Sequence, residues 1–474
     1  MLLPVIEFAR ALDKLRVSIL PMFGNIKSIV SDITHCGGRP LLVGGAVRDL
    51  LWDLPIKDLD IEVYGLSLET LESILKRYGV VRTVGKQFGV LRIDGIDSDW
   101  SIPRKDSEGR KPHVVCDPYM SLKKAFARRD VTINAMGIDL VHYTLEDPFN
   151  GVRDMRLGIL RAPDPELFVH DPLRFFRIMQ FVARFDVYPD NELQGVCKKM
   201  SLQGIAQERI FSEFEKMIIQ SSRPSLGFQW LFDVGRLQEC LPELFDTVTT
   251  VQDPLWHPEG SVFEHTKQAV DAAAQQQYKD SSERLIVVYA ALCHDLGKVV
   301  TTREIDGRVR ALGHDVKGVF LARSMLKRIT NKQNVIDAVS KLVRYHMMPV
   351  QFVVNKTGDS AYKRLALKLA PEITLHMLCR VATADKRGRN PKKNGPLDYL
   401  VIPEVECFFK KACSLGVAYG PELPILQGKD LLDYVPSGRG MGILLEQAYE
   451  IQIEEGIIDK DVLKKRVLGS LMHS

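Results

Sequence analysis

The sequence has no uninterrupted apolar run near the roughly 18 residues that a membrane-spanning helix needs, so we expect no contact with a membrane. Its N-terminal segment, residues 1–23, mixes charged with apolar residues and lacks a basic stretch followed by an apolar core. This segment therefore predicts an amphipathic helix rather than a signal peptide. None of the 8 cysteines forms a C-x-x-C pair, which is typical of free thiols in a reducing compartment. We therefore expect a cytoplasmic protein.

A strong excess of charge of one sign is also missing. The formal net charge of +4 at pH 7 permits a nucleic-acid partner but does not require one. Two local basic runs are more informative, although the second is explained equally well as a solvated surface. They comprise Lys123, Lys124, Arg128 and Arg129, and then Lys386, Arg387, Arg389, Lys392 and Lys393.

Hydrophobic periodicity divides the chain into an α+β head and a long helical body. Short apolar strands are expected at Pro40–Val43, Leu59–Val63, Val80–Arg82, Val90–Ile93 and Ala135–Leu140, with a helix at Ser67–Tyr78. Further along, helical periodicity takes over, as in Leu173–Phe185 and Ile210–Ile219. The residues between Asp253 and Gly260 resemble a linker, because proline and glycine interrupt the pattern there.

A chain of 474 residues is too long for one hydrophobic core, so several domains are expected. The head is predicted to be a small mixed sheet with helices, and all later parts to be helical. The expected parts are a helical extension (1–36), the head (37–158), a neck (159–250), a second helical domain (255–392) and a helical tail (393–474).

The segment Lys57–Val63 alternates charged and apolar residues with the period of two that is typical of a strand. Asp58, Asp60 and Glu62 would share one face, with the apolar side chains packed behind them. Taken alone, this pattern favours a solvent-facing edge strand over a catalytic one. The residues upstream change that balance.

Upstream stand a strand, two glycines and the start of a helix. Gly44 and Gly45 allow backbone N–H groups to approach a phosphate, and the helix N-terminus adds positive potential. Arg48 would clamp a triphosphate oxygen. Asp58 and Asp60 would then be the catalytic carboxylates and hold two Mg²⁺ ions, one activating an attacking 3′-hydroxyl and one steadying the departing pyrophosphate.

These motifs resemble the signature of the class II tRNA nucleotidyltransferase and bacterial poly(A) polymerase family. The resemblance rests on Gly44–Asp49, Asp58–Asp60, Gly85–Val90 and Arg128–Met136. It implies a head that acts on tRNA with CTP and ATP as substrates. It also implies that Arg129, Asp130 and Asn134 contact the ribose and hold the nucleotide, although Asn134 alone also suits a turn or cap. For Asp99, on the strand that follows, two roles are equally well supported: a third metal-facing carboxylate and an ordinary surface residue.

In the neck, Asp171 is expected to cap a helix that has Pro172 at its first position. Asp171, Arg174 and Arg177 recur every three residues and so share a face, which as structure alone suggests an ordinary ion pair. Arg209 and Glu213 are expected to brace the neck.

The Asp–Arg spacing also suits nucleotide selection. A carboxylate accepts from the amino group of cytosine or adenine, and a guanidinium donates to the adjacent ring nitrogen, whereas guanine and uracil present the reverse. The resembled family selects nucleotides in this way without a nucleic-acid template, which makes Asp171, Arg174 and Arg177 candidate nucleotide-binding residues. The sequence departs from the family pattern at His170, where Glu is usual, and at Gln180, where Arg is usual. Both departures bear on the stringency of selection.

The segment Lys105–Ala127 is long, polar and rich in glycine, proline and lysine, so it predicts a flexible loop. In the resembled family a loop here is needed for the switch to A. It therefore favours either complete CCA addition or addition of A alone, which the sequence does not separate. Poly(A) polymerase is a further alternative, although the domain that follows resembles the arrangement of CCA-adding enzymes.

The second helical domain carries the ligand pattern of an HD phosphohydrolase. His294 and Asp295 follow the apolar run Leu285–Cys293, and buried polar groups at such a helix end need partners that a metal ion supplies. The full candidate ligand set is His265, His294, Asp295, His314, His346 and Asp385.

These ligands suit one or two divalent transition metal ions, or Mg²⁺, and would activate water on a phosphate ester. By resemblance, the activity would be that of a phosphatase or cyclic phosphodiesterase at a damaged tRNA end. Lys298 would contact the phosphate or simply cap the helix.

Two classes of function remain open. In the first, an active nucleotidyltransferase is assisted by the HD domain in tRNA repair. In the second, the protein is an HD hydrolase whose degenerate head only binds RNA. Intact Asp58, Asp60 and Arg48 favour the first, whereas His170 and Gln180 favour the second. The sequence does not determine the oligomeric state.

Overall fold

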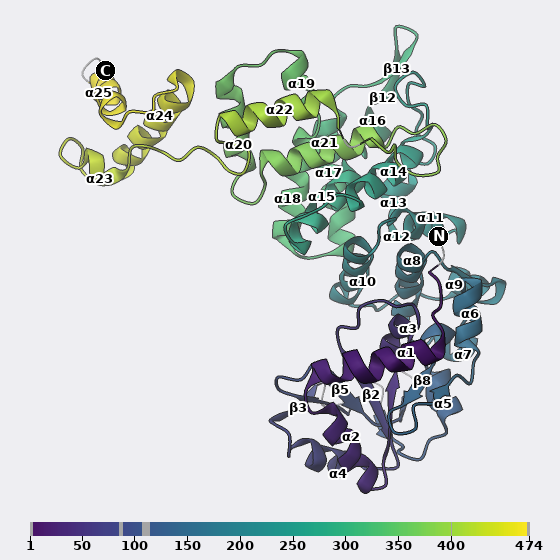
Figure 1. The fold of residues 1–474 in the computed structure, drawn as a ribbon. Coiled ribbons are helices and arrows are strands. Elements are labelled where there is room, and N and C mark those ends of the chain that lie inside the picture. The colour runs from purple at the N-terminus through teal and green to yellow at the C-terminus, as the bar shows by residue number, and fades with distance from the viewer. Residues whose placement is uncertain (1–2, 85–88, 107–113, 400, 472–474) are drawn as a thin grey trace. The chain divides into compact units, whose positions relative to one another are not determined.

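The structure is a computed structural model that describes residues 3–84, 89–106, 114–399 and 401–471 (Figure 1). It consists of two compact units, Met1–Glu213 and Phe214–Ser474, which are described separately. The boundary falls within the expected neck, and the finer domain limits stay predictions.

The first unit is built on a seven-stranded mixed sheet with the order β3-β4-β5-β2-β1-β8-β9. Its strands are β1 (Arg39–Val43), β2 (Leu59–Tyr64), β3 (Val81–Val84), β4 (Val90–Ile93), β5 (Ser98–Ser101), β8 (Gly137–Asp139) and β9 (Leu145–Glu146). Among the described residues of this sheet, β2 and β5 are the one parallel pair, and their register places Asp60 directly beside Asp99. This mixed sheet confirms the fold class predicted for the head.

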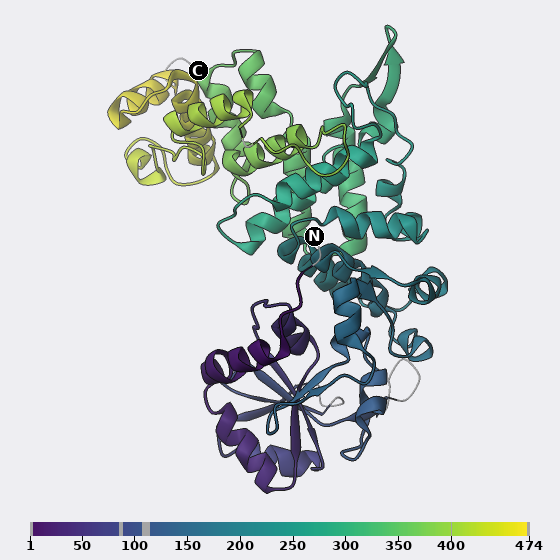
Figure 2. The ribbon, with the colours of Figure 1, turned by 45° about the vertical axis from the view of Figure 1, so that its right-hand side comes forward.

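Helices cover the sheet of the head, and the N-terminal ones, purple in Figure 2, lie along one side of it. The helices are α1 (Phe8–Lys14), α2 (Ile26–His35), α3 (Gly45–Leu51), α4 (Leu68–Leu75) and α5 (Leu122–Ala127), with single turns of π-helix at Leu15–Ile19 and 3-10 helix at Leu20–Phe23. Helix α4 begins after Ser67, whose hydroxyl accepts from the Thr70 amide at 3.2 Å. Phe126 of α5 is fully buried in a core cluster with Leu41 and Val43 of β1.

Two expected elements of the head differ from the structure. The expected strand Ala135–Leu140 is shortened to β8, because the preceding residues Thr132–Asn134 form a 3-10 turn. The expected flexible loop Lys105–Ala127 contains regular structure: β6 (Arg104–Asp106) pairs with β7 (Val114–Cys116), and α5 follows. Residues 107–113 of this loop, and 85–88 of the Gly85–Val90 motif, lie outside the described residues.

The rest of the first unit is helical apart from one pair of short strands, which the expected all-helical neck did not include. Its elements are α6 (Gly151–Leu157), α7 (Pro165–Phe168), α8 (Leu173–Phe185), α9 (Asn191–Lys199) and α10 (Gln207–Gln220), the last of which crosses the unit boundary. Two short strands, β10 (Ile159–Leu160) and β11 (Tyr188–Pro189), pair in parallel between them. Helix α8 buries one aromatic and aliphatic face, which includes Phe175, Ile178 and Phe181.

The second unit is a stack of helices in which α14, α15 and α21 pack on one another and α17 packs on α18. Its helices are α11 (Ser225–Asp233), α12 (Leu237–Cys240), α13 (Pro242–Phe245), α14 (Val262–Ala274), α15 (Ser281–Cys293), α16 (Lys298–Thr301), α17 (His314–Ile329), α18 (Gln333–Tyr345), α19 (Met348–Val354), α20 (Asp359–Leu369), α21 (Leu375–Arg387), α22 (Pro403–Ser414), α23 (Gly428–Leu431), α24 (Arg439–Glu455) and α25 (Lys460–Leu471). The last three share a small apolar core of their own, centred on Leu431 and Leu463.

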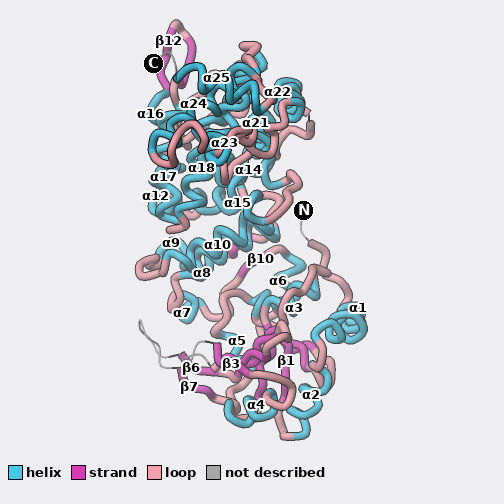
Figure 3. Tube along the Cα trace, turned by 90° about the vertical axis from the view of Figure 1, so that its left-hand side faces the viewer, coloured by secondary structure: helices cyan, strands magenta, loops and turns pink. Residues whose placement is uncertain are grey.

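The expectation that this second unit is all helical is wrong at one place. Strands β12 (Thr302–Ile305) and β13 (Arg308–Ala311) form an antiparallel hairpin, which Figure 3 shows in magenta among cyan helices. Its two-residue turn is Asp306-Gly307, and both residues have positive φ (53° and 68°). Asp-Gly is a strong sequence signal for such a turn, so the hairpin was predictable from the sequence.

The 8 cysteines are all free thiols, as expected. Among the residues that the structure describes, no helix combines the length and the apolar character needed to cross a membrane.

Candidate functional site

Three carboxylates meet at the edge of β2 in the head. Asp58 immediately precedes the strand, Asp60 lies on it, and Asp99 occupies the neighbouring position on β5. Desolvation by the surrounding protein raises the pKa of Asp60, although its side chain still reaches solvent, and Asp58 and Asp99 raise this pKa further. Crowded carboxylates of this kind are typical oxygen ligands for a divalent cation. The residues present therefore fit Mg²⁺.

Asp99 is already engaged by a residue that the sequence did not single out. Arg92 of β4 pairs with it through two hydrogen bonds of 2.6 and 2.8 Å. The register of β4 and β5, which sets Arg92 opposite Asp99, brings the two together. Whether Asp99 faces a metal stays a prediction.

Gly44 allows a close approach at the carboxylate site. Its φ is 74°, and a Cβ added there would lie 2.8 Å from Nη1 of Arg129 and 3.7 Å from Oδ2 of Asp60. A side chain at Gly44 would therefore both strain the backbone and displace the Arg129 guanidinium. The amide of Gly44 donates to the Met136 carbonyl at 3.3 Å, and Gly45 is the first residue of α3.

Arg48 is turned inward in the structure, although it was expected to clamp a triphosphate. Its side chain is 5% exposed, and its guanidinium donates to Asn134 Oδ1 at 2.6 Å and to Asp49 at 2.8 Å. The guanidinium also lies over the Phe185 ring, 4.8 Å from its centroid. Arg48 is thus part of the packing between head and α8, and its contact with a triphosphate stays a prediction.

Asp130 is the centre of a buried polar network. Its carboxylate accepts from Asn134 Nδ2 at 2.9 Å and from Arg177 Nε at 2.6 Å, in addition to the Val131 amide at 2.8 Å. Burial alone would raise the pKa of Asp130, but Arg177 and Asn134 outweigh it and leave a pKa of about 2. The chain Arg48–Asn134–Asp130–Arg177 therefore connects the nucleotide-binding candidates of the head with α8.

The three candidates of the neck lie close together but are held separately. Asp171 accepts from the Leu173 amide at 3.1 Å and pairs with Arg209 at 3.0 Å, which gives Arg209 the expected bracing role. Arg174 donates to the Leu167 carbonyl at 2.8 Å and to the Arg128 carbonyl. Within the described residues Asp171 and Arg174 form no direct ion pair, so the ordinary ion pair that their spacing alone suggested is absent. Helix α8 spans the expected Leu173–Phe185, but Pro172 stands at its N-cap rather than at its first position, so Asp171 lies one residue before the cap.

The two departures from the family pattern have different surroundings. His170 is exposed, whereas Gln180 is buried on α8. With its amide oxygen facing Arg184, Gln180 accepts from Arg184 Nη1 at 2.7 Å. Burial, with the nearby charge of Arg48, lowers the pKa of Arg184 to about 10. A guanidinium thus lies one helical turn beyond Gln180, and this spacing of four residues was visible in the sequence.

The six candidate ligands of the second unit converge from five helices or helix ends. His265 lies on α14, His294 and Asp295 follow α15, His314 opens α17, His346 follows α18 and Asp385 lies on α21. The structure thus brings together the complete ligand set predicted from the sequence. Its close approaches include His265 Nε2 to Asp385 Oδ1 at 3.1 Å. The Nε2 atoms of His265 and His294 lie 3.2 Å apart, and those of His314 and His346 lie 3.3 Å apart.

Hydrogen bonds fix the ring orientation of each of these histidines. The Nδ1 atoms of His294, His314 and His346 each lie 2.8 Å from a backbone carbonyl oxygen, to which Nδ1–H donates. The Nε2 lone pairs are therefore left facing the centre, as in protein metal sites. Burial lowers the pKa of His346 to about 3, which keeps this imidazole neutral and able to bind a metal.

Asp295 joins two groups of ligand atoms. One group is formed with His265 and His294, and the other with His314 and His346. The distances are 3.2 Å from Asp295 Oδ2 to His294 Nε2 and 3.4 Å from Oδ1 to His314 Nε2. One carboxylate that offers an oxygen to each group is suited to bridge two metal ions. The donor set therefore fits one or two divalent ions.

The segment interpreted as a linker forms a wall of this site. Glu259 is fully buried, and its Oε1 accepts from His265 Nδ1 at 2.7 Å and from His257 Nδ1 at 2.9 Å. Lys298 Nζ lies 2.7 Å from Asp295 Oδ2 and 3.3 Å from His257 Nε2. The sequence signal for a role of His257 and Glu259 was that both side chains are polar and stand shortly before His265. The neighbouring proline and glycine suggested a linker instead.

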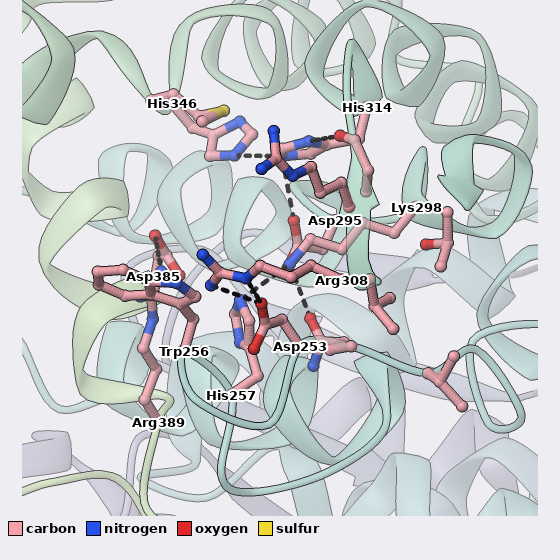
Figure 4. Close-up of a pocket in the computed structure, with 17 residues that line it drawn as sticks. Asp253, Trp256, His257, Asp295, Lys298, Arg308, His314, His346, Asp385 and Arg389 are labelled. Carbon is pink, nitrogen blue, oxygen red and sulfur yellow. Dashed lines mark hydrogen bonds and ion pairs between the residues drawn. The ribbon is translucent and has the colours of Figure 1, made fainter. Parts of the chain in front are cut away.

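Four of the six ligands, Asp295, His314, His346 and Asp385, line a cavity of about 350 Å³ (Figure 4). Arg389 of the second basic run pairs with Asp385 there at 3.2 Å, so this part of the run is not simply a solvated surface. Gly297 is needed beneath the site, because a Cβ there would lie 2.0 Å from the His314 carbonyl oxygen. The glycine lets α16 approach the start of α17 and so places His314.

Three families match parts of the chain. They are described as the poly A polymerase head domain (residues 41–161), a probable RNA and SrmB-binding site of polymerase A (196–247) and the HD domain (262–382).

Relatives match much longer stretches. The multifunctional CCA protein of Pasteurella multocida is 32% identical over 73% of this chain and 83% of that protein. The multifunctional CCA protein of Methylobacillus flagellatus is 33% identical over 65% of this chain and 74% of that protein.

Among solved structures, the Bacillus stearothermophilus CCA-adding enzyme in complex with CTP has a TM-score of 0.64 and 20% identity. The match covers 96% of this chain and 100% of that one. The Thermotoga maritima CCA-adding enzyme complexed with tRNA has a TM-score of 0.58, with 19% identity over 99% of both chains. At these identities the solved structures establish the fold alone.

Proposed function

The chain belongs to the family of the multifunctional CCA proteins, and we propose that it adds C and A to the 3′ end of tRNA, using CTP and ATP. The observation that carries this proposal is the group of Asp58, Asp60 and Asp99 beside the Gly44 turn and the Arg129 guanidinium. Two further considerations support it. The relatives are named for CCA, and proteins of the same fold have been solved with CTP, with ATP and with tRNA.

In the proposed reaction the 3′-oxygen of the RNA bonds to the α-phosphorus, the α–β phosphoanhydride breaks, and pyrophosphate leaves while the hydroxyl proton passes to solvent. Asp58 and Asp60 would hold the cations. Two Mg²⁺ ions bound there would favour deprotonation of the hydroxyl and neutralise charge on the pyrophosphate. Arg129 lies beside Asp60 with its Nη2 atom 3.6 Å from Glu62, and would bind a nucleotide oxygen.

The base would be selected by Asp171 and Arg174. Two backbone carbonyls orient Arg174, and Arg209 orients Asp171, so each group is preset before a nucleotide binds. Asp171 would accept from the amino group of C or A, and Arg174 would donate to the ring nitrogen. Asp130 would act on Asp171 and Arg174 indirectly, because it holds Arg177, which lies on α8 together with Arg174.

For the second unit we propose a metal-dependent phosphohydrolase that acts on phosphate esters at a damaged tRNA end, including a 2′,3′-cyclic phosphate. The favouring observation is the pair of ligand groups that share Asp295. Divalent ions bound there would lower the pKa of a water molecule. The water oxygen would form a bond to phosphorus, and one bond between phosphorus and a ribose oxygen would break. The released ribose oxygen would take up a proton. Lys298, close to Asp295, would stabilise the phosphate charge.

The head is tested by nucleotide incorporation with Mg²⁺, in which CTP, ATP, GTP and UTP are offered separately to tRNAs that end before CCA, after C and after CC. Addition of C, C and then A, abolished in Asp58→Ala/Asp60→Ala, is expected. Extension of only the tRNA ending in CC would indicate an A-adding enzyme, and a long A tail would indicate a poly(A) polymerase. If no tRNA is extended, the hydrolase would be the one proposed activity that remains.

The hydrolase is tested separately with tRNA ending in a 2′,3′-cyclic phosphate and a panel of divalent ions. Hydrolysis is expected in the wild type and in Asp58→Ala/Asp60→Ala, and it should be lost in His294→Ala. Retention of activity in His294→Ala would contradict the assignment of the site.

A further inference from the structure

The segment Gln252–Gly260 is anchored to the cavity of the second unit at several points. Gln252 accepts from Lys298 Nζ at 2.7 Å and donates to the Gly260 carbonyl at 3.2 Å. Asp253 accepts two hydrogen bonds from Arg308, at 3.0 and 2.7 Å, and its backbone carbonyl accepts from the amides of Trp256 and His257. The backbone on both sides of Trp256 is therefore fixed.

Trp256 is exposed in spite of these anchors. Its side chain is 60% exposed, and the preceding Leu255 is 81% exposed. Trp256 lines the same cavity as the candidate metal ligands, and Figure 4 shows it beside Asp385 and Arg389. The indole of Trp256 is thus carried on a fixed backbone and presents an aromatic face to solvent at the wall of a polar cavity, where a ligand can stack on it.

Arg310 provides a free positive charge at the same cavity. It lies on β13 two residues from Arg308, so both side chains leave the same face of the hairpin. Arg308 donates hydrogen bonds to Asp253. The exposed side chain of Arg310, in contrast, has no hydrogen bond or ion pair within the described ranges of the chain. Lys298 and Arg389, by contrast, are paired with Asp295 and Asp385. Arg310 is therefore available to an anionic ligand without losing a partner.

We propose that Trp256 and Arg310 form a subsite for the terminal nucleotide of an RNA. The base of this nucleotide stacks on the indole, and its phosphate is bound by the guanidinium. The subsite rests on the phosphohydrolase function proposed above and would determine its specificity for nucleotide ends. Bases of any identity stack on an aromatic ring, so the subsite suits an RNA end of any sequence. The cavity of about 350 Å³ is large enough for one nucleotide.

The test uses two substrates that differ only in the base: adenosine 2′,3′-cyclic phosphate and methyl ribofuranoside 2,3-cyclic phosphate. Trp256→Ala should raise KM roughly tenfold for the first and leave the second unchanged, because stacking requires the base. Arg310→Ala should raise KM about tenfold for both, because both carry the phosphate. In each case kcat should change little.

Arg303→Ala is the matched control for Arg310→Ala. Arg303 lies opposite Arg310 in the hairpin register and is also exposed, but it is not among the residues that line the cavity. It should leave KM for both substrates unchanged. An equal effect of Arg303→Ala and Arg310→Ala, or an equal effect of Trp256→Ala on both substrates, would overturn the subsite.

A binding measurement separates this inference from the proposed hydrolase. Calorimetric titration of the metal-loaded full chain with adenosine 2′-phosphate should show weaker binding in both Trp256→Ala and Arg310→Ala. If neither cyclic phosphate is hydrolysed but this difference is found, the hydrolase proposal fails and the subsite stands. If hydrolysis occurs and the variants bind and react like the wild type, the subsite is refuted and the hydrolase stands.

Discussion

Replacing Asp130 with asparagine should destabilise the first unit far more than its small chemical change suggests. The carboxylate is buried, and it receives hydrogen bonds from Arg177, Asn134 and the Val131 amide. The substituted side chain would keep the shape but leave the Arg177 guanidinium without its counter-charge, and its amide N–H₂ would face donors. Lowering the Asp130 pKa from an ordinary 3.8 to about 2 corresponds to roughly 2 kcal/mol of stability.

The pH dependence has a definite sign. Because the folded pKa of Asp130 lies below the unfolded value of 3.8, its contribution is fully present well above pH 3.8, and it is lost as the pH falls through 3.8 toward about 2. The difference in unfolding free energy between wild type and Asp130→Asn should therefore be constant from neutral pH down to roughly pH 5, and then shrink.

Urea unfolding followed by hydrogen exchange in α8 measures this difference in the full chain. Asp53→Asn is the matched control, since Asp53 is an exposed carboxylate whose φ of 57° suits asparagine and whose partner is the surface residue Lys14. It should change the unfolding free energy little, because a solvent-exposed ion pair contributes little to stability. An Asp130→Asn cost no larger than that of the control would refute the reasoning. So would a difference between wild type and Asp130→Asn that grows as the solution is acidified.

Three further predictions follow from single contacts. Glu259→Gln should weaken metal binding by the second unit roughly 10- to 100-fold, measured as metal content after dialysis, while nucleotide incorporation is unchanged, because Glu259 orients His265. Gly44→Ala should lower incorporation at least about tenfold by displacing Arg129, whereas Gly204→Ala, at a similar φ (80°) with open space around it, should keep activity; equal activities would contradict this role. Gly297→Ala should lower the melting temperature and the metal content together, since its Cβ would overlap the His314 carbonyl, and normal metal content would disprove that placement.

The sequence by itself determined the elements and residue types of both sites. Alternation at Lys57–Val63 predicts strand β2, and an apolar run followed by His294-Asp295 predicts a buried helix with ligands at its end. These signals are local, because periodicity of two or 3.6 residues follows directly from backbone geometry. The hairpin turn at Asp306-Gly307 was equally local and would have been predicted from its dipeptide.

The partners of each charged side chain were decided only by the tertiary structure. Arg48 and Arg177 meet Asn134 and Asp130 across 86 and 47 residues of sequence, and Asp171 selects Arg209 across 38. Glu259, in a segment that looked like a linker, becomes the buried acceptor for His265. Such pairings depend on which elements pack together, and the same guanidinium can satisfy any carboxylate brought within reach. The sequence therefore names the charged groups, and the packing of the sheet and helices assigns them to one another.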